Sequence, residues 1–220
     1  MSHLPCVEVG PESQARASVI WLHGLGANGH DFEPVVPELH LPQELAVRFV
    51  FPHAPAMPVT INNGYVMPAW YDITEMSIGQ NVDIQGLLRS ADAVRLLIDR
   101  EVERGIDSRR IVIAGFSQGG AVGYQVALTH PEPLAGLLAL SAYFATATTI
   151  HPDPANVSLP VSIYHGTADP IVPEFLGRES RDALVRLGYR PDYKTYPMQH
   201  AVCMEEITDI SRVLQAWLST

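Results

Sequence analysis

Residues 110–120 read Arg110-Ile-Val-Ile-Ala-Gly115-Phe-Ser117-Gln-Gly-Gly120, and a stretch with helical character follows at 121–129. The β-branched, apolar start of this stretch is typical of a buried strand. Glycines two positions on either side of Ser117 remove the Cβ atoms that would clash in a very tight strand-to-helix turn. A phosphate-binding turn would instead need a nearby Lys or a Gly-x-Gly-x-x-Gly pattern, and neither is present. The pattern therefore predicts a nucleophilic serine at the start of a helix.

Strand-like and helix-like segments alternate from residue 18 to the end of the chain. Further strands are expected at 18–22, 47–51, 134–140, 161–164 and 193–196, and further helices at 87–102, 174–187 and 207–218. Gly105 is expected to end the first of these helices. Such alternation implies right-handed crossovers, and therefore an α/β fold with a mostly parallel central sheet and helices on both faces. In folds of this kind ligands bind at the carboxyl ends of the strands.

A serine hydroxyl needs a base to take its proton, and the base needs a carboxylate to orient it. The expected chain order is Ser, acid, His. Asp169 lies just beyond the strand predicted at 161–164, and His200 lies between the last predicted strand and the terminal helix. We interpret Asp169 as the acid and His200 as the general base. The rival acids are expected to be surface charges: Asp153, Asp182 and Asp192.

The tetrahedral intermediate of acyl transfer needs hydrogen-bond donors for its oxyanion. One should be the backbone amide of Gln118, the residue after the nucleophile. The other should come from the loop after the first predicted strand, which reads His23-Gly-Leu-Gly-Ala-Asn-Gly29. The amide of Leu25 is the expected donor, and His23 is expected to support the loop. No His-x-x-x-His or clustered Cys/His spacing favours a metal site.

Composition narrows the classes of partner. The chain has 220 residues, of which 47% are hydrophobic and 17% charged, so we expect a single domain over residues 1–220. Its 14 Lys and Arg against 24 Asp and Glu give a net charge of −10. This charge would repel phosphate backbones, and nucleic-acid partners are not expected.

The N-terminal segment, residues 1–6, lacks a basic region followed by an apolar stretch, so we expect the protein to stay in the cytoplasm. The longest apolar run, residues 134–145, is far shorter than the roughly 20 residues of a membrane span. Stable membrane insertion is therefore not expected. Cys6 and Cys203 form no disulfide framework and are expected to be small packing residues.

Seven segments of the chain, taken together, follow the sequence pattern of one known family. They are His23-Gly-Leu-Gly26, Gly29-His-Asp-Phe32, Phe51-Pro-His-Ala-Pro55, Met67-Pro-Ala-Trp-Tyr-Asp72, Gly115-Phe-Ser-Gln-Gly-Gly120, His165-Gly-Thr-Ala-Asp-Pro-Ile-Val-Pro173 and Tyr196-Pro-Met-Gln-His200. Over nearly its whole length the chain resembles the phospholipase/carboxylesterase family, which includes bacterial carboxylesterases and acyl-protein thioesterases. One departure is Ala201, where many relatives carry a serine.

The resemblance implies an α/β-hydrolase fold without a large cap domain, an open apolar acyl groove, and no metal or cofactor. It also allows for a homodimer. It implies the same triad, Ser117, Asp169 and His200, and the same oxyanion donors, the amides of Leu25 and Gln118. In the region 57–79, five apolar residues are expected either to line an acyl pocket or to pack the loop: Met57, Val59, Ile61, Val66 and Met67. Trp70 is expected to hold this loop on the body.

The function expected first is a serine carboxylesterase that hydrolyses short to medium acyl esters through an acyl-serine intermediate. The alternatives with the same chemistry are an acyl-protein thioesterase and a lysophospholipase, and the sequence does not separate them. A non-catalytic binding protein on the same scaffold is the remaining alternative. It is disfavoured because the Ser, acid and His are all present at suitable positions.

Overall fold

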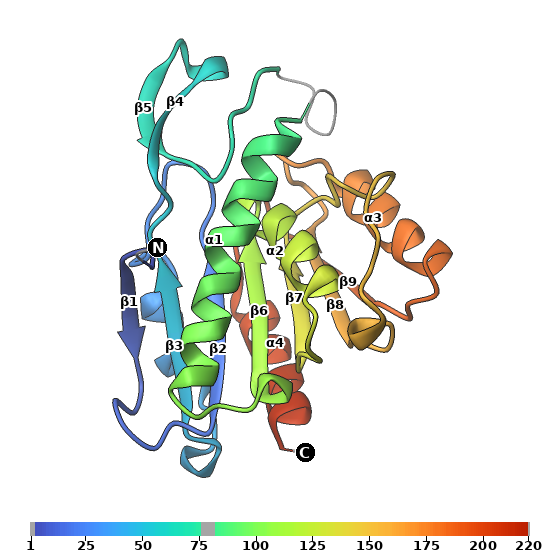
Figure 1. The fold of residues 1–220 in the computed structure, drawn as a ribbon. Coiled ribbons are helices and arrows are strands. Elements are labelled where there is room, and N and C mark those ends of the chain that lie inside the picture. Colours follow the sequence, from blue (N-terminus) through green and yellow to red (C-terminus); the bar gives the residue numbers. More distant parts are fainter. Residues whose placement is uncertain (1–2, 76–81, 220) are drawn as a thin grey trace.

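A computed structural model describes residues 3–75 and 82–219. In this part of the chain a central sheet has the strand order β1-β3-β2-β6-β7-β8-β9 (Figure 1). The strands are β1 (Cys6–Val9), β2 (Ala17–Leu22), β3 (Val47–Pro52), β6 (Ile111–Phe116), β7 (Gly136–Leu140), β8 (Val161–Gly166) and β9 (Asp192–Tyr196). The edge strand β1 pairs antiparallel with β3, and every other pairing in this sheet is parallel.

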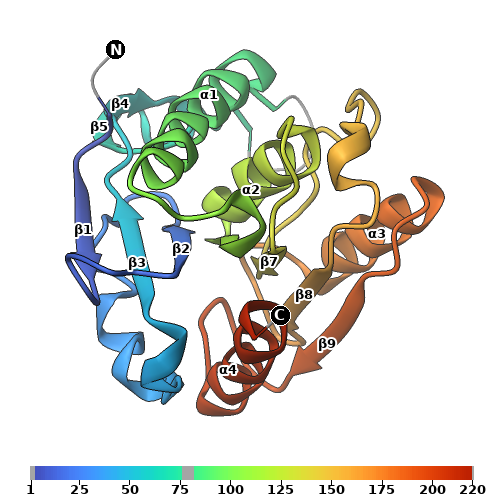
Figure 2. The same ribbon diagram turned by 60° about the horizontal axis from the view of Figure 1, so that its bottom comes forward.

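Helices cover both faces of the sheet. They are α1 (Ile84–Glu103), α2 (Gln118–Thr129), α3 (Glu174–Arg186) and α4 (Met204–Leu218). Helices α1, α2 and α3 share one apolar core with one face, whereas α4 and a segment of short 3₁₀ turns pack on the other (Figure 2). The predicted α/β fold with a mostly parallel sheet is confirmed, and Gly105 follows the end of α1 with a φ of 93°.

Three strands of the structure, β1, β4 (Ala56–Val59) and β5 (Tyr65–Pro68), are not among those predicted from the sequence. The strand β1 is a four-residue edge strand, too short to show a clear pattern. Strands β4 and β5 form a hairpin that follows β3. Its turn contains Asn63 at φ 54° and Gly64 at φ 73°, and Asn-Gly is a strong signal for a hairpin turn with two positive φ angles. That signal was available in the sequence.

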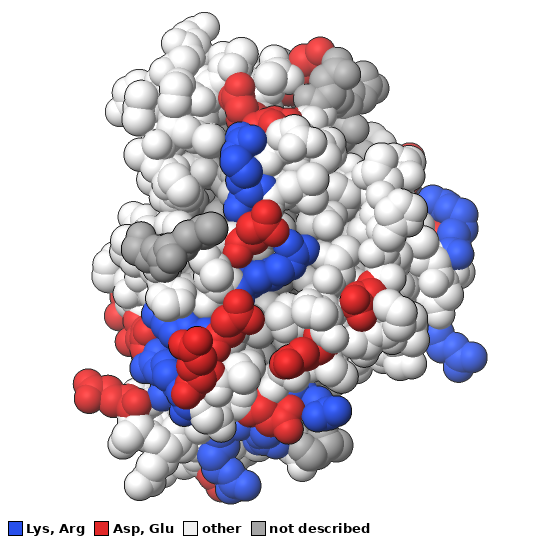
Figure 3. Space-filling view, viewed as in Figure 1, with Lys and Arg blue, Asp and Glu red and all other residues white. Residues whose placement is uncertain are grey.

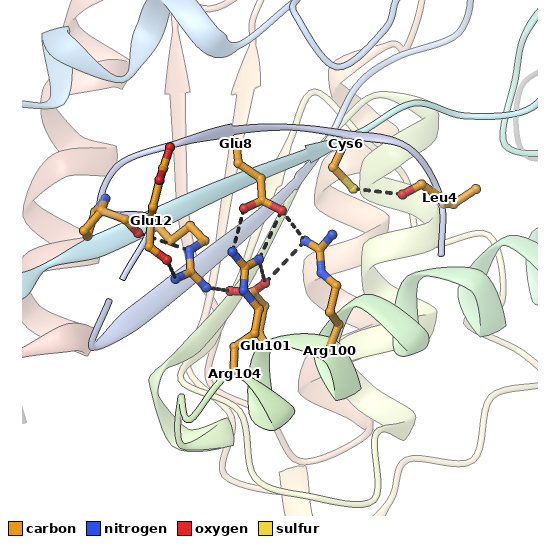
Figure 4. A network of polar contacts seen from close by, with 9 residues as sticks. Leu4, Cys6, Glu8, Glu12, Arg100, Glu101 and Arg104 are labelled. Carbon is orange, nitrogen blue, oxygen red and sulfur yellow. Dashed lines mark hydrogen bonds and ion pairs between the residues drawn. The ribbon is translucent and has the colours of Figure 1, made fainter. Parts of the chain in front are cut away.

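A buried ion pair joins the edge of the sheet to α1. Arg48 on β3 donates to Glu101 on α1 over 2.8 Å, and neither side chain is more than 4% exposed. Arg104 also contacts Glu101, at 2.9 Å. Glu8 of β1 lies between Arg100 and Arg104, at 2.9 and 3.0 Å (Figure 4). These contacts hold a short edge strand that hydrogen bonds to β3 alone would hold weakly.

Charged side chains gather over α1 and the neighbouring edge of the sheet, whereas the hairpin is uncharged (Figure 3). Residues 56–68 contain no Lys, Arg, Asp or Glu. Tyr65 and Val66 at its tip are 69% and 58% exposed. None of the described helices is long and apolar enough to cross a membrane.

We predict that Glu101→Gln lowers the free energy of unfolding by about 3–5 kcal/mol, because it leaves the buried Arg48 charge without its partner. Urea denaturation of wild type and variant measures the difference. Asp92→Asn on the same helix is the matched control, since Asp92 is 74% exposed and should change stability by less than about 0.5 kcal/mol. A loss for Glu101→Gln no larger than that of the control would contradict the prediction.

A second prediction concerns Glu206 on α4, which is fully buried. Burial raises the pKa of Glu206 from 4.5 to about 8, and the nearby Cys203 amide offsets only part of this rise. Between these two values the unfolded chain releases a proton that the folded protein keeps. Stability should therefore fall as pH rises through this window, by at most about 1.4 kcal/mol per pH unit.

The Glu206→Gln variant lacks this proton, so its stability relative to wild type should increase from about pH 5 to about pH 8. Urea denaturation at the two pH values measures the change. If the free energies of unfolding of variant and wild type differ by the same amount at both pH values, Glu206 is ionised in the folded protein.

Candidate active site

Ser117 occupies a strained turn between β6 and α2. Its φ of 55° and ψ of −120° lie in a region that glycine adopts freely and other residues rarely do. The turn is closed by hydrogen bonds from the Ser117 amide to the carbonyl of Leu140 and from the Gly120 amide to the carbonyl of Ser117, at 2.9 and 3.0 Å.

The glycines around Ser117 are required by close backbone approaches. A Cβ atom at Gly115 would lie 2.5 Å from the carbonyl oxygen of Gly119, and one at Gly119 would lie 2.5 Å from that of Leu22. Such distances are shorter than real Cβ contacts, so a side chain would force the backbone apart. The steric reason predicted for the Gly-x-Ser-x-Gly pattern is therefore confirmed.

His200 joins Ser117 to Asp169 in one hydrogen-bonded chain. Its Nε2 lies 2.9 Å from the Oγ of Ser117, and its Nδ1 lies 2.7 Å from the Oδ2 of Asp169. Because a carboxylate can only accept, Nδ1 carries the proton and Nε2 presents its lone pair to the serine hydroxyl. The ring of Phe116 packs against the imidazole, with centroids 4.7 Å apart.

The second carboxylate oxygen of Asp169 is also paired. Its Oδ1 accepts hydrogen bonds from the amides of Ile171 and Val172, at 2.9 and 2.8 Å. Burial by itself would raise the pKa of Asp169, but the hydrogen bonds from His200 and these amides hold it below its ordinary value. Asp169 is therefore a carboxylate at neutral pH, as an acid that orients a histidine must be.

The rival carboxylates have other surroundings. Asp153 accepts the amide of Ala155 at the start of a 3₁₀ turn, Asp182 pairs with Arg181 on α3, and Asp192 is exposed at the start of β9. The structure thus brings together the three residues expected from the chain order, and it places these three aspartates elsewhere.

The two segments that carry the predicted oxyanion donors pass close to the serine. Gln118 is the first residue of α2, so its amide faces the turn at the helix start. The backbone of the other loop passes close to the nucleophile, because a Cβ atom at Gly24 would lie 3.5 Å from the Cβ of Ser117. Leu25, whose amide is the second expected donor, follows directly and is half-buried.

A set of hydrogen bonds that the sequence did not predict connects the start of α2 to the loop after β2. The side-chain amide of Gln118 accepts from the amide of Trp70 and donates to the carbonyl of Tyr71, at 2.8 and 2.7 Å. The indole N–H of Trp70 donates to the carbonyl of His23 over 2.8 Å. Trp70 is 1% exposed, which agrees with its expected role of holding this loop on the body.

The five apolar residues expected at an acyl pocket are placed differently from one another. Val59 is completely buried, which favours the packing alternative for it, whereas Val66 is 58% exposed. Met57, Ile61 and Met67 are half-buried. The sulfur of Met67 lies 3.7 Å from the position that a Cβ atom would have at Gly26. Met67 therefore borders residues 23–29, the loop that carries the Leu25 amide and is called the oxyanion loop below. Residues 76–79 of the region 57–79 lie outside the described residues.

A comparison with known protein families gives a match over nearly the whole chain. A model of the phospholipase/carboxylesterase family matches residues 5–218. The chain belongs to the phospholipase/carboxylesterase family. It is therefore a hydrolase with the α/β-hydrolase fold, as the resemblance implied.

Several members of this family are similar over nearly their whole length. Acyl-protein thioesterase 1 of Neurospora crassa is 39% identical, with 97% of this chain and 92% of the relative covered. Acyl-protein thioesterase 1 of Gibberella zeae is 38% identical, with 94% and 92% covered. The crystal structure of Zea mays acyl-protein thioesterase 2 has a TM-score of 0.85 at 28% identity, with 98% of this chain and 100% of that chain covered.

The strained backbone of Ser117 leads to a stability prediction. Ser117→Gly should relieve the strain, whereas Ser117→Ala keeps a Cβ atom and should not. We therefore expect Ser117→Gly to be more stable than Ser117→Ala by about 1–2 kcal/mol, with both variants inactive. Thermal and urea denaturation of the two variants measure this. Equal stability of the pair would show that the turn stores no strain.

Proposed function

We propose that the protein is an acyl-protein thioesterase, with Ser117 as nucleophile, His200 as general base and Asp169 as the acid that orients His200. The observation that carries the catalytic part is the hydrogen-bonded chain from Ser117 through His200 to Asp169. The thioester preference is supported by relatives at 37–39% identity that are called acyl-protein thioesterase 1. These relatives favour the thioesterase alternative over a carboxylesterase for short to medium acyl esters, the function expected first from the sequence.

The first half of the reaction forms an acyl-serine. His200 Nε2 takes the proton of the Ser117 hydroxyl while Oγ attacks the thioester carbonyl carbon. The negative charge that develops on the carbonyl oxygen is stabilised by the amides of Leu25 and Gln118. The carbon–sulfur bond then breaks, and the imidazolium gives its proton to the departing thiolate. Asp169 stabilises the imidazolium throughout.

The second half releases the acid. A water molecule gives a proton to His200 Nε2 and attacks the acyl carbon, and the second tetrahedral intermediate uses the same two amides. The carbon–Oγ bond breaks, Ser117 recovers its proton from His200, and the carboxylic acid leaves. The uncharged hairpin beside the oxyanion loop, with Met67 at its border, supports an apolar acyl group as the part of the substrate that is recognised.

The assignment of the nucleophile is tested with a fluorophosphonate probe, which phosphonylates an activated serine. We expect one adduct on Ser117 by peptide mass spectrometry, and a loss of hydrolysis of about 10⁶-fold in Ser117→Ala, as for removal of the nucleophile of other serine hydrolases. The mutation Ser18→Ala, at a buried serine of β2, is the matched control and should keep the adduct. An adduct on another residue would overturn the assignment.

The substrate class is tested with two peptides that differ in one atom. One carries a fatty acyl group on a cysteine and the other carries the same group on a serine at the same position. Each kcat/KM is divided by the hydroxide-catalysed rate for the same peptide, which removes the intrinsic reactivity of the thioester. We expect the corrected ratio to favour the thioester by at least about tenfold, or about 1.4 kcal/mol of transition-state stabilisation. A ratio that favours the ester would restore the carboxylesterase interpretation, and faster cleavage of a lysophospholipid would favour the lysophospholipase.

A further inference from the structure

His23 is a buried histidine with both ring nitrogens engaged. It follows the last residue of β2 and is 1% exposed. Its Nδ1 lies 2.7 Å from the carbonyl oxygen of Gly24, and its Nε2 lies 3.1 Å from the amide nitrogen of Ala54. A carbonyl only accepts and an amide only donates, so these partners select the neutral tautomer with the proton on Nδ1. Burial also lowers the pKa of His23, which keeps the ring neutral.

The carbonyl that His23 holds belongs to the same peptide unit as the amide of Leu25. This unit is trans and planar, so its C=O and N–H point to opposite sides. A side chain that fixes the direction of the Gly24 carbonyl therefore also fixes the direction of the Leu25 N–H. The backbone at Gly24 passes close to the nucleophile, since a Cβ atom placed there would lie 3.5 Å from the Cβ of Ser117.

Other contacts fix the position of the loop, and one of them shares the Gly24 carbonyl with His23. The indole of Trp70 holds the carbonyl of His23, and the amide of Gly26 donates to the carbonyl of Pro68 at 2.8 Å. The amide of Ala27 also donates to the carbonyl of Gly24, but over 3.3 Å. The contact from His23 at 2.7 Å is the shorter of the two on this oxygen.

We propose that His23 is a positioning residue that aims the amide of Leu25 at the developing oxyanion, through its Nδ1–H bond to the Gly24 carbonyl and the anchoring of its Nε2 by Ala54. This inference rests on the proposed function, because the amide has an oxyanion to stabilise only if Ser117 is acylated. The negative charge is largest in the transition state, so a misdirected donor costs more there than in the bound substrate. The effect therefore belongs in kcat and not in KM.

Two substitutions distinguish the roles of the two ring nitrogens of His23. In His23→Asn the side-chain amide can place an N–H where Nδ1 was, which keeps the bond to Gly24 and loses the one to Ala54. In His23→Gln the side-chain oxygen can reach the position of Nε2, which keeps the bond to Ala54 and loses the one to Gly24. We expect His23→Gln to lower kcat about 10- to 100-fold with KM changed less than about threefold, since a displaced donor costs less than the 10²–10³ of a deleted one. His23→Asn should lose clearly less.

The matched control is His53→Gln, which by the same reasoning loses a loop bond made at Nδ1. His53 accepts the amide of Gly29 at 3.1 Å, farther along the same loop, and has no contact with the Gly24 peptide in the described structure. It should lower kcat less than His23→Gln does. A loss that is equal in the His23→Asn and His23→Gln variants, or that falls on KM, would reduce His23 to a structural residue and overturn the proposal.

Binding of an alkyl boronic acid gives a readout that a structural role would not move. The boronate forms an anionic tetrahedral adduct with Ser117 and so resembles the transition state. Its inhibition constant should weaken in His23→Gln by about the same factor as kcat/KM. If inhibition is unchanged while kcat falls, the residue does not act through the oxyanion hole.

NMR of the ring nitrogens of His23 in the wild-type protein keeps the test independent of variant folding. The neutral Nδ1–H tautomer is expected, and the Nε2–H tautomer would overturn the proposal. Failure of this inference is distinct from failure of the proposed function. If wild type hydrolyses neither thioester nor ester, the proposed function fails; if wild type is active and His23→Gln matches it, only the role of His23 fails.

Discussion

The candidate active site depends on one strained turn. Ser117 has a φ of 55° at the point where β6 enters the turn and α2 leaves it, and the two elements approach so closely that the space between them admits no side chain. That space is kept free by glycines, since a Cβ at Gly115 or Gly119 would lie 2.5 Å from backbone oxygen atoms. The strain has a use, because it lifts the hydroxyl above the sheet to a point that loops from other strands can reach. The cost is offset by the packed parallel sheet on both sides of β6.

Around this turn, hydrogen bonds place polar groups that are otherwise costly to bury. Asp169 and His200 come from loops after β8 and β9, and the carboxylate is paired on both of its oxygens. His165 contributes in the same manner, since its Nε2–H donates to the carbonyl of Val172 at 2.8 Å while the amide of Val172 donates to Asp169. Burial lowers the pKa of His165, so this ring acts as a neutral donor. Two neutral histidines, His23 and His165, thus each hold one backbone carbonyl beside the candidate active site.

The edge of the sheet at β1 and β3 is stabilised by ion pairs to α1. The edge strand β1 has few hydrogen bonds of its own, and it is tied to α1 by an ion-pair network around the buried Glu101. This network lies at the carboxyl end of α1, whereas the uncharged hairpin β4–β5 lies near the other end of that helix (Figure 1). The hairpin contains no Lys, Arg, Asp or Glu between residues 56 and 68, and its Met67 lies beside Gly26.

The sequence by itself determined the alternation of strands and helices and the Gly-x-Ser-x-Gly turn, because periodicity and backbone clashes are local properties. It also predicted which serine, aspartate and histidine would meet, since the carboxyl ends of parallel strands share one edge of the sheet. Only the tertiary structure decided how that site is supported. The hydrogen bonds that Trp70 donates to His23 and to Gln118 join residues 47 and 48 positions apart. The tautomer of His23 and the burial of Val59 likewise depend on neighbours brought close by folding, and no local pattern encodes such neighbours.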